Sequence, residues 1–134
     1  MSYLIDTDIV IYSIKGNRIV QNRFMENENI PKAISVITYG ELLFGAKKSK
    51  NVGKNLAVVY RIKELFPIIG IDKAIIETFS DIKVNMQKAG SLVDDMDLLI
   101  ASTALTMNCT LVTNNEKHFS RIKGLKIENW NKEQ

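Results

Sequence analysis

The sequence has few of the residues that build disulfides and soft-metal sites. Among its 134 residues there is one cysteine, Cys109, and one histidine, His118. A single cysteine excludes an internal disulfide, and the CxxC or Cys/His spacing of zinc sites is absent. We therefore expect a reduced, cytoplasmic setting.

Long apolar runs are missing as well. No stretch reaches the roughly 18 consecutive apolar residues that a membrane-spanning helix needs. The first eight residues are too short and too acidic for a signal peptide. We expect no membrane association.

The composition is that of an ordinary globular protein with a small basic excess. Hydrophobic residues make up 46% of the chain and charged residues 25%, which predicts one domain spanning residues 1–134 with a sizeable core. The formal net charge of +3 is compatible with a polyanionic partner such as RNA.

Strand-like and helix-like segments alternate along the chain. Short apolar runs are separated by segments in which apolar residues recur at helical spacing. Such alternation forms parallel βαβ units, so the predicted fold class is α/β, with a central parallel sheet of four to five strands and helices on both faces. The expected strands are 3–5, 33–36, 68–71, 110–113 and 125–127, and the expected helices are 8–14, 17–25, 38–48, 52–65, 73–88 and 97–107.

Three acids, Asp94, Asp95 and Asp97, lie within four positions directly before a strongly apolar helical run. One of them, most simply Asp94, could act as the N-cap of that helix, and the others could favour the positive end of its dipole. A cap uses only one acid, however, and like charges this close repel one another. The cluster therefore also fits a carboxylate aimed at a cation.

Other polar residues follow the predicted strands. Asp6 comes directly after the first strand, Glu41 lies in the helix after the second, and residues 113–115 follow the strand at 110–113. Ligands bind at the carboxyl edge of a parallel sheet, so Asp6, Glu41 and Asp97 are predicted to converge there if the loop before Asp97 folds over that edge. An all-oxygen cluster of this kind favours Mg²⁺ or Mn²⁺ over zinc.

Each acid also has a simpler interpretation. Glu41 could close a capping box that begins at Thr38, and Asp6 could cap the first helix. Asp8 is better interpreted as an acid in the first turn of that helix, or as a group behind the ligands, than as a ligand itself.

Four segments carry a family resemblance that covers nearly the whole chain. They are LIDTDIVIY, SVITYGELLFGAKKS, DDMDLLIASTAL and LVTNNEKHFSRIKGLKIENW. In this order they resemble the successive blocks of the PIN-domain ribonucleases, and more narrowly the VapC toxins of bacterial toxin–antitoxin pairs. The resemblance implies a three-layer α/β/α fold and a Mg²⁺-dependent endoribonuclease that forms a homodimer. It further implies neutralisation by a small VapB-type antitoxin, and one VapC branch cleaves tRNA.

By this resemblance Asp6, Glu41 and Asp97 occupy the positions of the three principal metal-site acids of the family. The TNNEKHF segment departs from the commonest pattern, which has a further acid where this chain has Asn115. Candidate substitutes in a second metal site or behind the first are Asn115, Glu116 and Asp95, while Thr113 and Asn114 match positions that order the site.

The implied reaction is hydrolysis by a metal-activated water, with Glu41 or Asp95 taking the proton. His118 is interpreted as a structural or substrate-edge residue. Lys47, Lys48, Lys50 and Lys54 form the densest basic run, which fits either a solvated face or phosphate contacts. An antitoxin helix or a second protomer is expected to cover an apolar face that includes Leu43, Phe44, Val59 and Tyr60.

Two other functions fit parts of the sequence. Asp6-Thr7-Asp8-Ile9-Val10 matches the D-x-D-x-[TV] signature of haloacid-dehalogenase-like phosphatases, in which Asp6 would be a covalent nucleophile and Asp8 a general acid. That interpretation leaves Glu41 and the TNN segment without a role. The second alternative is a non-catalytic RNA-binding module that keeps the fold.

Overall fold

A parallel sheet of five strands forms the centre of the molecule. The computed structural model describes residues 1–91 and 93–133. The strands lie in the order β3-β2-β1-β4-β5, and every pair of neighbours is parallel. Their bounds are Tyr3–Ile5 for β1, Lys32–Ser35 for β2, Ile68–Ile69 for β3, Thr110–Val112 for β4 and Ile127–Glu128 for β5.

Side chains of each strand alternate between two separate cores, because successive residues of a strand face opposite sides of the sheet. In β1, Tyr3 and Ile5 belong to one core and Leu4 to the other. In β4, Val112 and Leu111 divide in the same way. The sheet is therefore buried on both faces, as expected for a parallel sheet.

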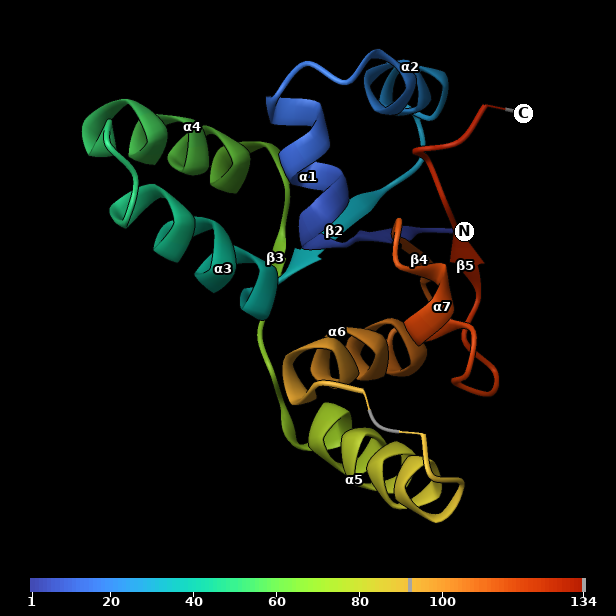
Figure 1. Cartoon of the computed structure of the whole chain (residues 1–134). Coiled ribbons are helices and arrows are strands. Elements are labelled where there is room, and N and C mark those ends of the chain that lie inside the picture. The colour runs from blue at the N-terminus through green and yellow to red at the C-terminus, as the bar shows by residue number, and fades with distance from the viewer. Residues whose placement is uncertain (92, 134) are drawn as a thin grey trace.

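The helices cover both faces of the sheet (Figure 1). The core of one face is built with α1 (Thr7–Ile14), α2 (Arg18–Glu26), α3 (Val36–Lys47) and α4 (Val52–Leu65). The opposite core is built with α5 (Lys73–Lys88), α6 (Asp95–Thr106) and α7 (Glu116–Phe119). This is the predicted three-layer α/β/α arrangement. None of the helices in the described part of the chain is long and apolar enough to cross a membrane.

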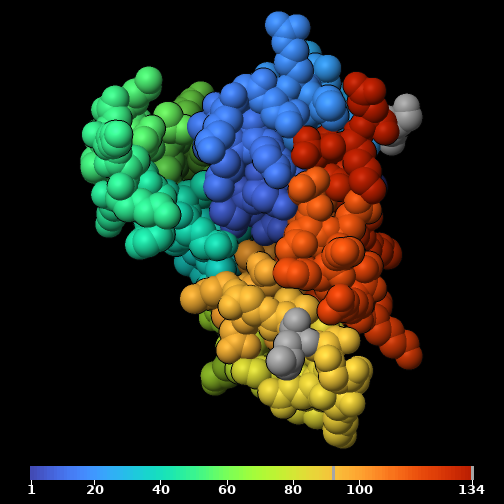
Figure 2. Space-filling model, viewed as in Figure 1, coloured from blue at the N-terminus to red at the C-terminus, as the bar shows by residue number. Residues whose placement is uncertain are grey.

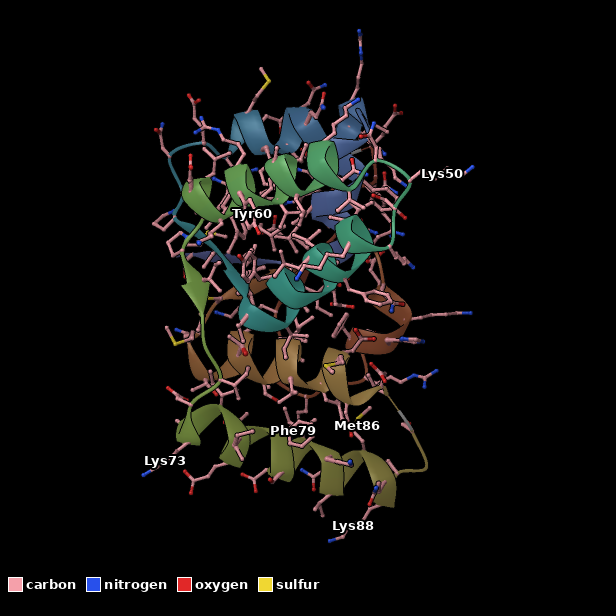
Figure 3. The ribbon with its side chains drawn as sticks, turned by 90° about the vertical axis from the view of Figure 1, so that its left-hand side faces the viewer. Lys50, Tyr60, Lys73, Phe79, Met86 and Lys88 are labelled. Atoms are coloured by element: carbon pink, nitrogen blue, oxygen red, sulfur yellow. The ribbon has the colours of Figure 1, made fainter. Side chains whose placement is uncertain are left out.

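The pairing of α5 with α6 forms the outer edge of the second layer. Phe79 and Met86 of α5 point toward α6 (Figure 3) and pack into the core that contains Leu4 and Leu98. The polar side of α5, with Lys73 and Lys88, faces away from the molecule. This division follows from the helical spacing of the apolar residues.

The predicted strands and helices were all found, some with the expected bounds and the others with ends shifted by one or two residues. The expected helix at 38–48 begins at Val36, because Ser35 is its N-cap and accepts a hydrogen bond from the Ile37 amide. The expected helix at 97–107 begins at Asp95, with Asp94 as its N-cap. The short helix α7 was not predicted.

Candidate functional site

Asp6 lies at the carboxyl end of β1, where the strand ends and α1 begins. Its side chain is 6% exposed and both carboxylate oxygens accept hydrogen bonds. Oδ1 accepts from the Thr7 amide at 2.8 Å, and Oδ2 accepts from the Thr113 hydroxyl at 2.7 Å. Asp6 is thus the N-cap of α1, as its simpler interpretation proposed, but its second oxygen is directed to the end of β4.

Asp8 lies beside Asp6 in the first turn of α1. Its Oδ2 accepts a hydrogen bond from the Asn114 amide at 3.1 Å. Its Oδ1 is buried and receives no hydrogen bond within the described residues. Burial raises the pKa of Asp8, and the Asn114 amide, the Ile9 amide and the Thr113 hydroxyl offset only part of this rise.

Glu41 lies in the second turn of α3, and its partner comes from α1. The Thr7 hydroxyl donates to Glu41 Oε1 at 2.8 Å and lies 3.0 Å from the Thr38 hydroxyl. The capping box interpretation was wrong, because α3 begins before Thr38 and its N-cap is Ser35. Glu41 is therefore linked to the first strand-end loop and does not cap its own helix.

Asp97 reaches the same region from the opposite layer. It lies in the first turn of α6, and its Oδ2 is 3.9 Å from Nδ1 of His118 in α7. The His118 ring nitrogen is in turn 2.9 Å from Nδ2 of Asn115. Figure 2 shows α1 in blue, α3 in teal, α6 in amber and the segment after β4 in orange meeting on one face of the molecule.

These acids influence one another electrostatically. Burial, and then the charges of Asp8 and Asp97, raise the pKa of Asp6 to about 7, although its two hydrogen bonds act in the opposite direction. Burial is also the main cause of a raised pKa at Asp8, where the Asp97 charge adds to it. The pKa of Asp97 is raised by burial and by the charges of Asp94 and Glu41.

Asp97 is thus close enough to Asp6 to raise its pKa, and Glu41 is close enough to Asp97 to do the same there. Within residues 1–91 and 93–133, no three His, Cys, Asp or Glu side chains are arranged to hold one metal ion as they stand. In the same part of the chain, no Lys or Arg forms an ion pair with Asp6, Glu41 or Asp97. In the part of the chain that the structure describes, the site therefore brings acidic side chains together without a direct ion pair to Lys or Arg.

Several of the other predicted site residues are engaged elsewhere. Asp95 forms an ion pair with Lys83 of α5, with 3.0 Å between Oδ1 and Nζ. Glu116 accepts a hydrogen bond from Asn129 and pairs with Lys132, and these contacts lower its pKa. Neither acid is directed at Asp6.

The segment after β4 contributes hydroxyl and backbone donors to the site. The Asn115 amide donates to the Thr113 hydroxyl at 3.0 Å, and that hydroxyl donates to Asp6. The side chain of Asn114 is directed away from the acids, toward Tyr12 and the C-terminal segment.

Two sets of residues in this region were not predicted. Thr7 holds Glu41, and its only signal in the sequence is its place between Asp6 and Asp8. Asn129 and Asn131 lie 15 and 17 positions after Asn114, the residue of the TNN segment that they contact, and no local pattern marks them.

Comparison with known proteins assigns the chain to a family. The model of the family described as "PIN domain" matches residues 3–125. A curated relative named Ribonuclease VapC2, from Haemophilus influenzae, is 36% identical over 132 residues, which cover 97% of this chain and 98% of the relative. The chain belongs to the VapC family of PIN-domain ribonucleases.

Two further relatives extend this assignment. The protein of Shigella flexneri named tRNA(fMet)-specific endonuclease VapC is 32% identical over 131 residues, covering 97% of this chain and 98% of the relative. The solved structure of VapBC2 from Rickettsia felis, bound to a DNA fragment from its promoter, has a TM-score of 0.91 and 34% identity to this VapC-family chain. The matched region covers 97% of this chain and 99% of the chain in that structure. The match favours the PIN nuclease over the haloacid-dehalogenase-like phosphatase.

Proposed function

We propose that this VapC-family protein is a metal-dependent endoribonuclease and the toxin of a VapBC-type pair. The observation that supports this most strongly is the coupling of Asp6, Asp97 and Glu41 at the carboxyl edge of the sheet without a neutralising Lys or Arg among the described residues. Burial destabilises the charged form of a carboxylate, and a cation beside it stabilises that form.

The donors in the site fit a hard divalent ion, Mg²⁺ or Mn²⁺. Carboxylate, hydroxyl and amide oxygens predominate in the site. The lone cysteine directly precedes β4, at the end of that strand opposite the site. Asp6 and Asp97 would hold the ion, with Glu41 as a third ligand or behind a bound water. When bound, such an ion lowers the pKa of a water molecule and neutralises charge on the phosphate oxygens.

Side chains of the protein would orient the attacking water and accept its proton. Glu41 would take the proton of the attacking water, because the alternative base, Asp95, is paired with Lys83, and the Thr7 hydroxyl holds Glu41 Oε1 in position. In-line hydrolysis leaves 5′-phosphate and 3′-hydroxyl ends. His118 lies at the rim of the site, 3.9 Å from Asp97, where it would face the substrate.

RNA would approach across α3 and the start of α4. Lys15 and Lys48 line the same groove as Glu41, which has a volume of about 680 Å³. Lys50 extends into solvent from the loop between α3 and α4 (Figure 3), and Lys47 is in the last turn of α3. We propose tRNA as the substrate class because the relative from Shigella flexneri is named for it.

A VapB-type antitoxin is the proposed protein partner. Phe44 is 66% exposed and lies in the groove beside Glu41. A second hollow of about 410 Å³ adjoins it between α1, α3 and α4. An exposed aromatic side chain in an apolar groove is typical of a surface that binds a helix. A homodimer, as the resemblance implies, remains part of this proposal.

The test is cleavage of total tRNA by purified protein with Mg²⁺, with Mn²⁺ and with EDTA, followed by sequencing of the new ends. We expect cleavage only with the metal ions. Glu41→Gln should lose it, whereas Glu77→Gln, an exposed change on α5, should not.

Two results would favour the alternatives. A phosphatase would lose activity with Asp8→Asn and keep it with Glu41→Gln. A non-catalytic module would bind RNA equally well in EDTA and would not cleave it with Mn²⁺.

A further inference from the structure

The C-terminal segment is fixed to the body of the protein by Trp130. This side chain is fully buried and makes edge-to-face contacts with Tyr3 and Phe24, at ring-centroid distances of 5.1 and 4.9 Å. Its Nε1 donates to Glu128 at 3.1 Å. The residues on either side of Trp130 therefore have fixed positions.

Those neighbours, Asn129 and Asn131, both contact Asn114. Each donates from its Nδ2 to Asn114 Oδ1 at 3.3 Å. The Asn131 amide also donates to Asn129 Oδ1 at 2.9 Å. On the other side, Asn17 Nδ2 donates to Asn131 Oδ1 at 2.8 Å. We call Asn17, Asn114, Asn129 and Asn131 the asparagine clamp.

The clamp ends at the acids of the candidate site. With its side chain held by the clamp, Asn114 donates its backbone N–H to Asp8. The adjoining residues continue the connection, because the Asn115 amide donates to Thr113 and the Thr113 hydroxyl donates to Asp6. The backbone after β4 is thus held between the C-terminal segment on one side and Asp6 and Asp8 on the other.

We propose that Asn129 and Asn131 are positioning residues of the nuclease site, acting through Asn114 to hold the donors that orient Asp6 and Asp8. This inference rests on the proposed function for its catalytic consequence. Groups that orient metal-binding carboxylates matter nearly as much as the carboxylates themselves, because an unsupported ligand samples unproductive orientations. Neither asparagine touches the substrate or a reacting atom in this role.

The decisive variant is Asn131→Asp. It keeps the size of the side chain and an acceptor for Asn17, but replaces the donor to Asn114 with an oxygen. We expect kcat for RNA cleavage to fall about tenfold or more and the Mg²⁺ concentration for half-maximal activity to rise. KM should change little. Asn131→Ala should behave alike, and Asn85→Ala, an exposed change on α5, should match wild type.

A readout that does not require activity is amide hydrogen exchange of the metal-free protein, measured by NMR. The Asn114 amide should exchange faster in Asn131→Asp than in wild type, while amides of α5 should not change. Wild-type kcat, Mg²⁺ dependence and Asn114 exchange in Asn131→Asp would overturn the inference. A wild-type protein that cleaves no RNA would instead overturn the proposed function, and the exchange rates would then decide the clamp alone.

Discussion

Asp6 has two structural roles, and the sequence around it does not distinguish between them. One oxygen caps α1 and the other is held by Thr113, which comes from a segment more than a hundred residues later. The cap explains why the chain turns here, and the burial of the carboxylate, followed by the charges of Asp8 and Asp97, explains the raised pKa of Asp6. Both follow from the position of Asp6 between a strand and a helix.

The raised pKa of Asp6 gives the metal-free protein a defined pH dependence. Folded Asp6 titrates near pH 7 and unfolded Asp near 3.9, so between these values the folded state binds the proton more tightly. Stability should therefore increase as the pH is lowered from 8 to 5, with a contribution from this group of at most about 1.4 kcal/mol per pH unit.

Thermal melts in EDTA across this pH range would measure the effect. Asp6→Asn should remove its share of the slope, and Asp81→Asn, an exposed change on α5, should not. An equal slope in wild type and Asp6→Asn would show that Asp6 is ionised in the folded protein across the whole range.

Asp97 is predicted to link stability to the metal ion. Asp97→Asn relieves repulsion with Asp94 and Glu41, so the metal-free variant should melt no lower than wild type. Mg²⁺ should stabilise wild type more than the variant. The unfolding free energy of wild type should increase by about 2.7 kcal/mol when the ion is at a hundredfold excess over its Kd. Identical Mg²⁺-induced shifts in Tm for the two proteins would exclude Asp97 as a ligand.

Single residues were predictable where local sequence sets their place. Asp6 follows an apolar strand, and Asp94 precedes an apolar helix, so their positions at element ends could be inferred. Thr7 and Asn131 could not, because their roles depend on contacts with residues 34 and 17 positions away. No periodicity encodes such distances.

At the scale of elements, the direction of α6 explains why Asp97 reaches the site. The helix leads into β4, which is parallel to β1, and a helix in such a unit runs opposite to its strands. Its first turn therefore lies at the carboxyl edge, beside Asp6. The convergence was predicted only on the condition that the loop before Asp97 folds over that edge, whereas the direction of α6 in a βαβ unit is enough to bring Asp97 there.

The N-cap of α6 provides a test that separates geometry from charge. Asp94 Oδ2 accepts a hydrogen bond from the Met96 amide at 3.2 Å, and its charge raises the pKa of Asp97. Asp94→Asn keeps a good cap, so its unfolding free energy should stay near wild type, whereas Asp94→Ala should lose about 1 kcal/mol. Urea unfolding in EDTA would measure both, and equal losses would contradict the capping role.

The short elements were the least predictable. The four residues of α7 are fewer than a helical pattern needs, and the helix has no side-chain N-cap bond. The last strand begins at Ile127, two residues later than its apolar run at 125–127 indicated, because pairing with Leu111 and Val112 of β4 sets the register. Tertiary pairing thus decided the position of the last strand.

At the scale of the whole molecule, the basic side chains are unevenly placed relative to the site. Lys48 lines the groove that holds Glu41, and Lys47 and Lys50 lie close to Lys48 in the chain at the C-terminal end of α3. Lys73 and Lys88 lie on α5 at the opposite edge of the molecule (Figure 3). The fold class and its layers followed from the alternation of strands and helices. The distribution of charge around the site could be seen only in the structure.

This asymmetry predicts how RNA binding depends on salt. Replacing Lys47, Lys48 and Lys50 with Gln should weaken binding in EDTA and reduce the slope of log K against log salt by about 2 if all three contact phosphates of single-stranded RNA. The double variant Lys73→Gln and Lys88→Gln should keep the wild-type slope. Fluorescence anisotropy at several salt concentrations would measure this, and equal slopes would place the RNA elsewhere.

The central claim is that carboxylates from three distant segments bind one hard cation at the edge of the sheet. Crystals of the protein grown with Mn²⁺ and measured near the manganese absorption edge test it most directly. We predict an anomalous peak in contact with carboxylate oxygens of both Asp6 and Asp97, which is lost in Asp97→Asn. A peak elsewhere, or no peak at these acids at saturating Mn²⁺, would contradict the account.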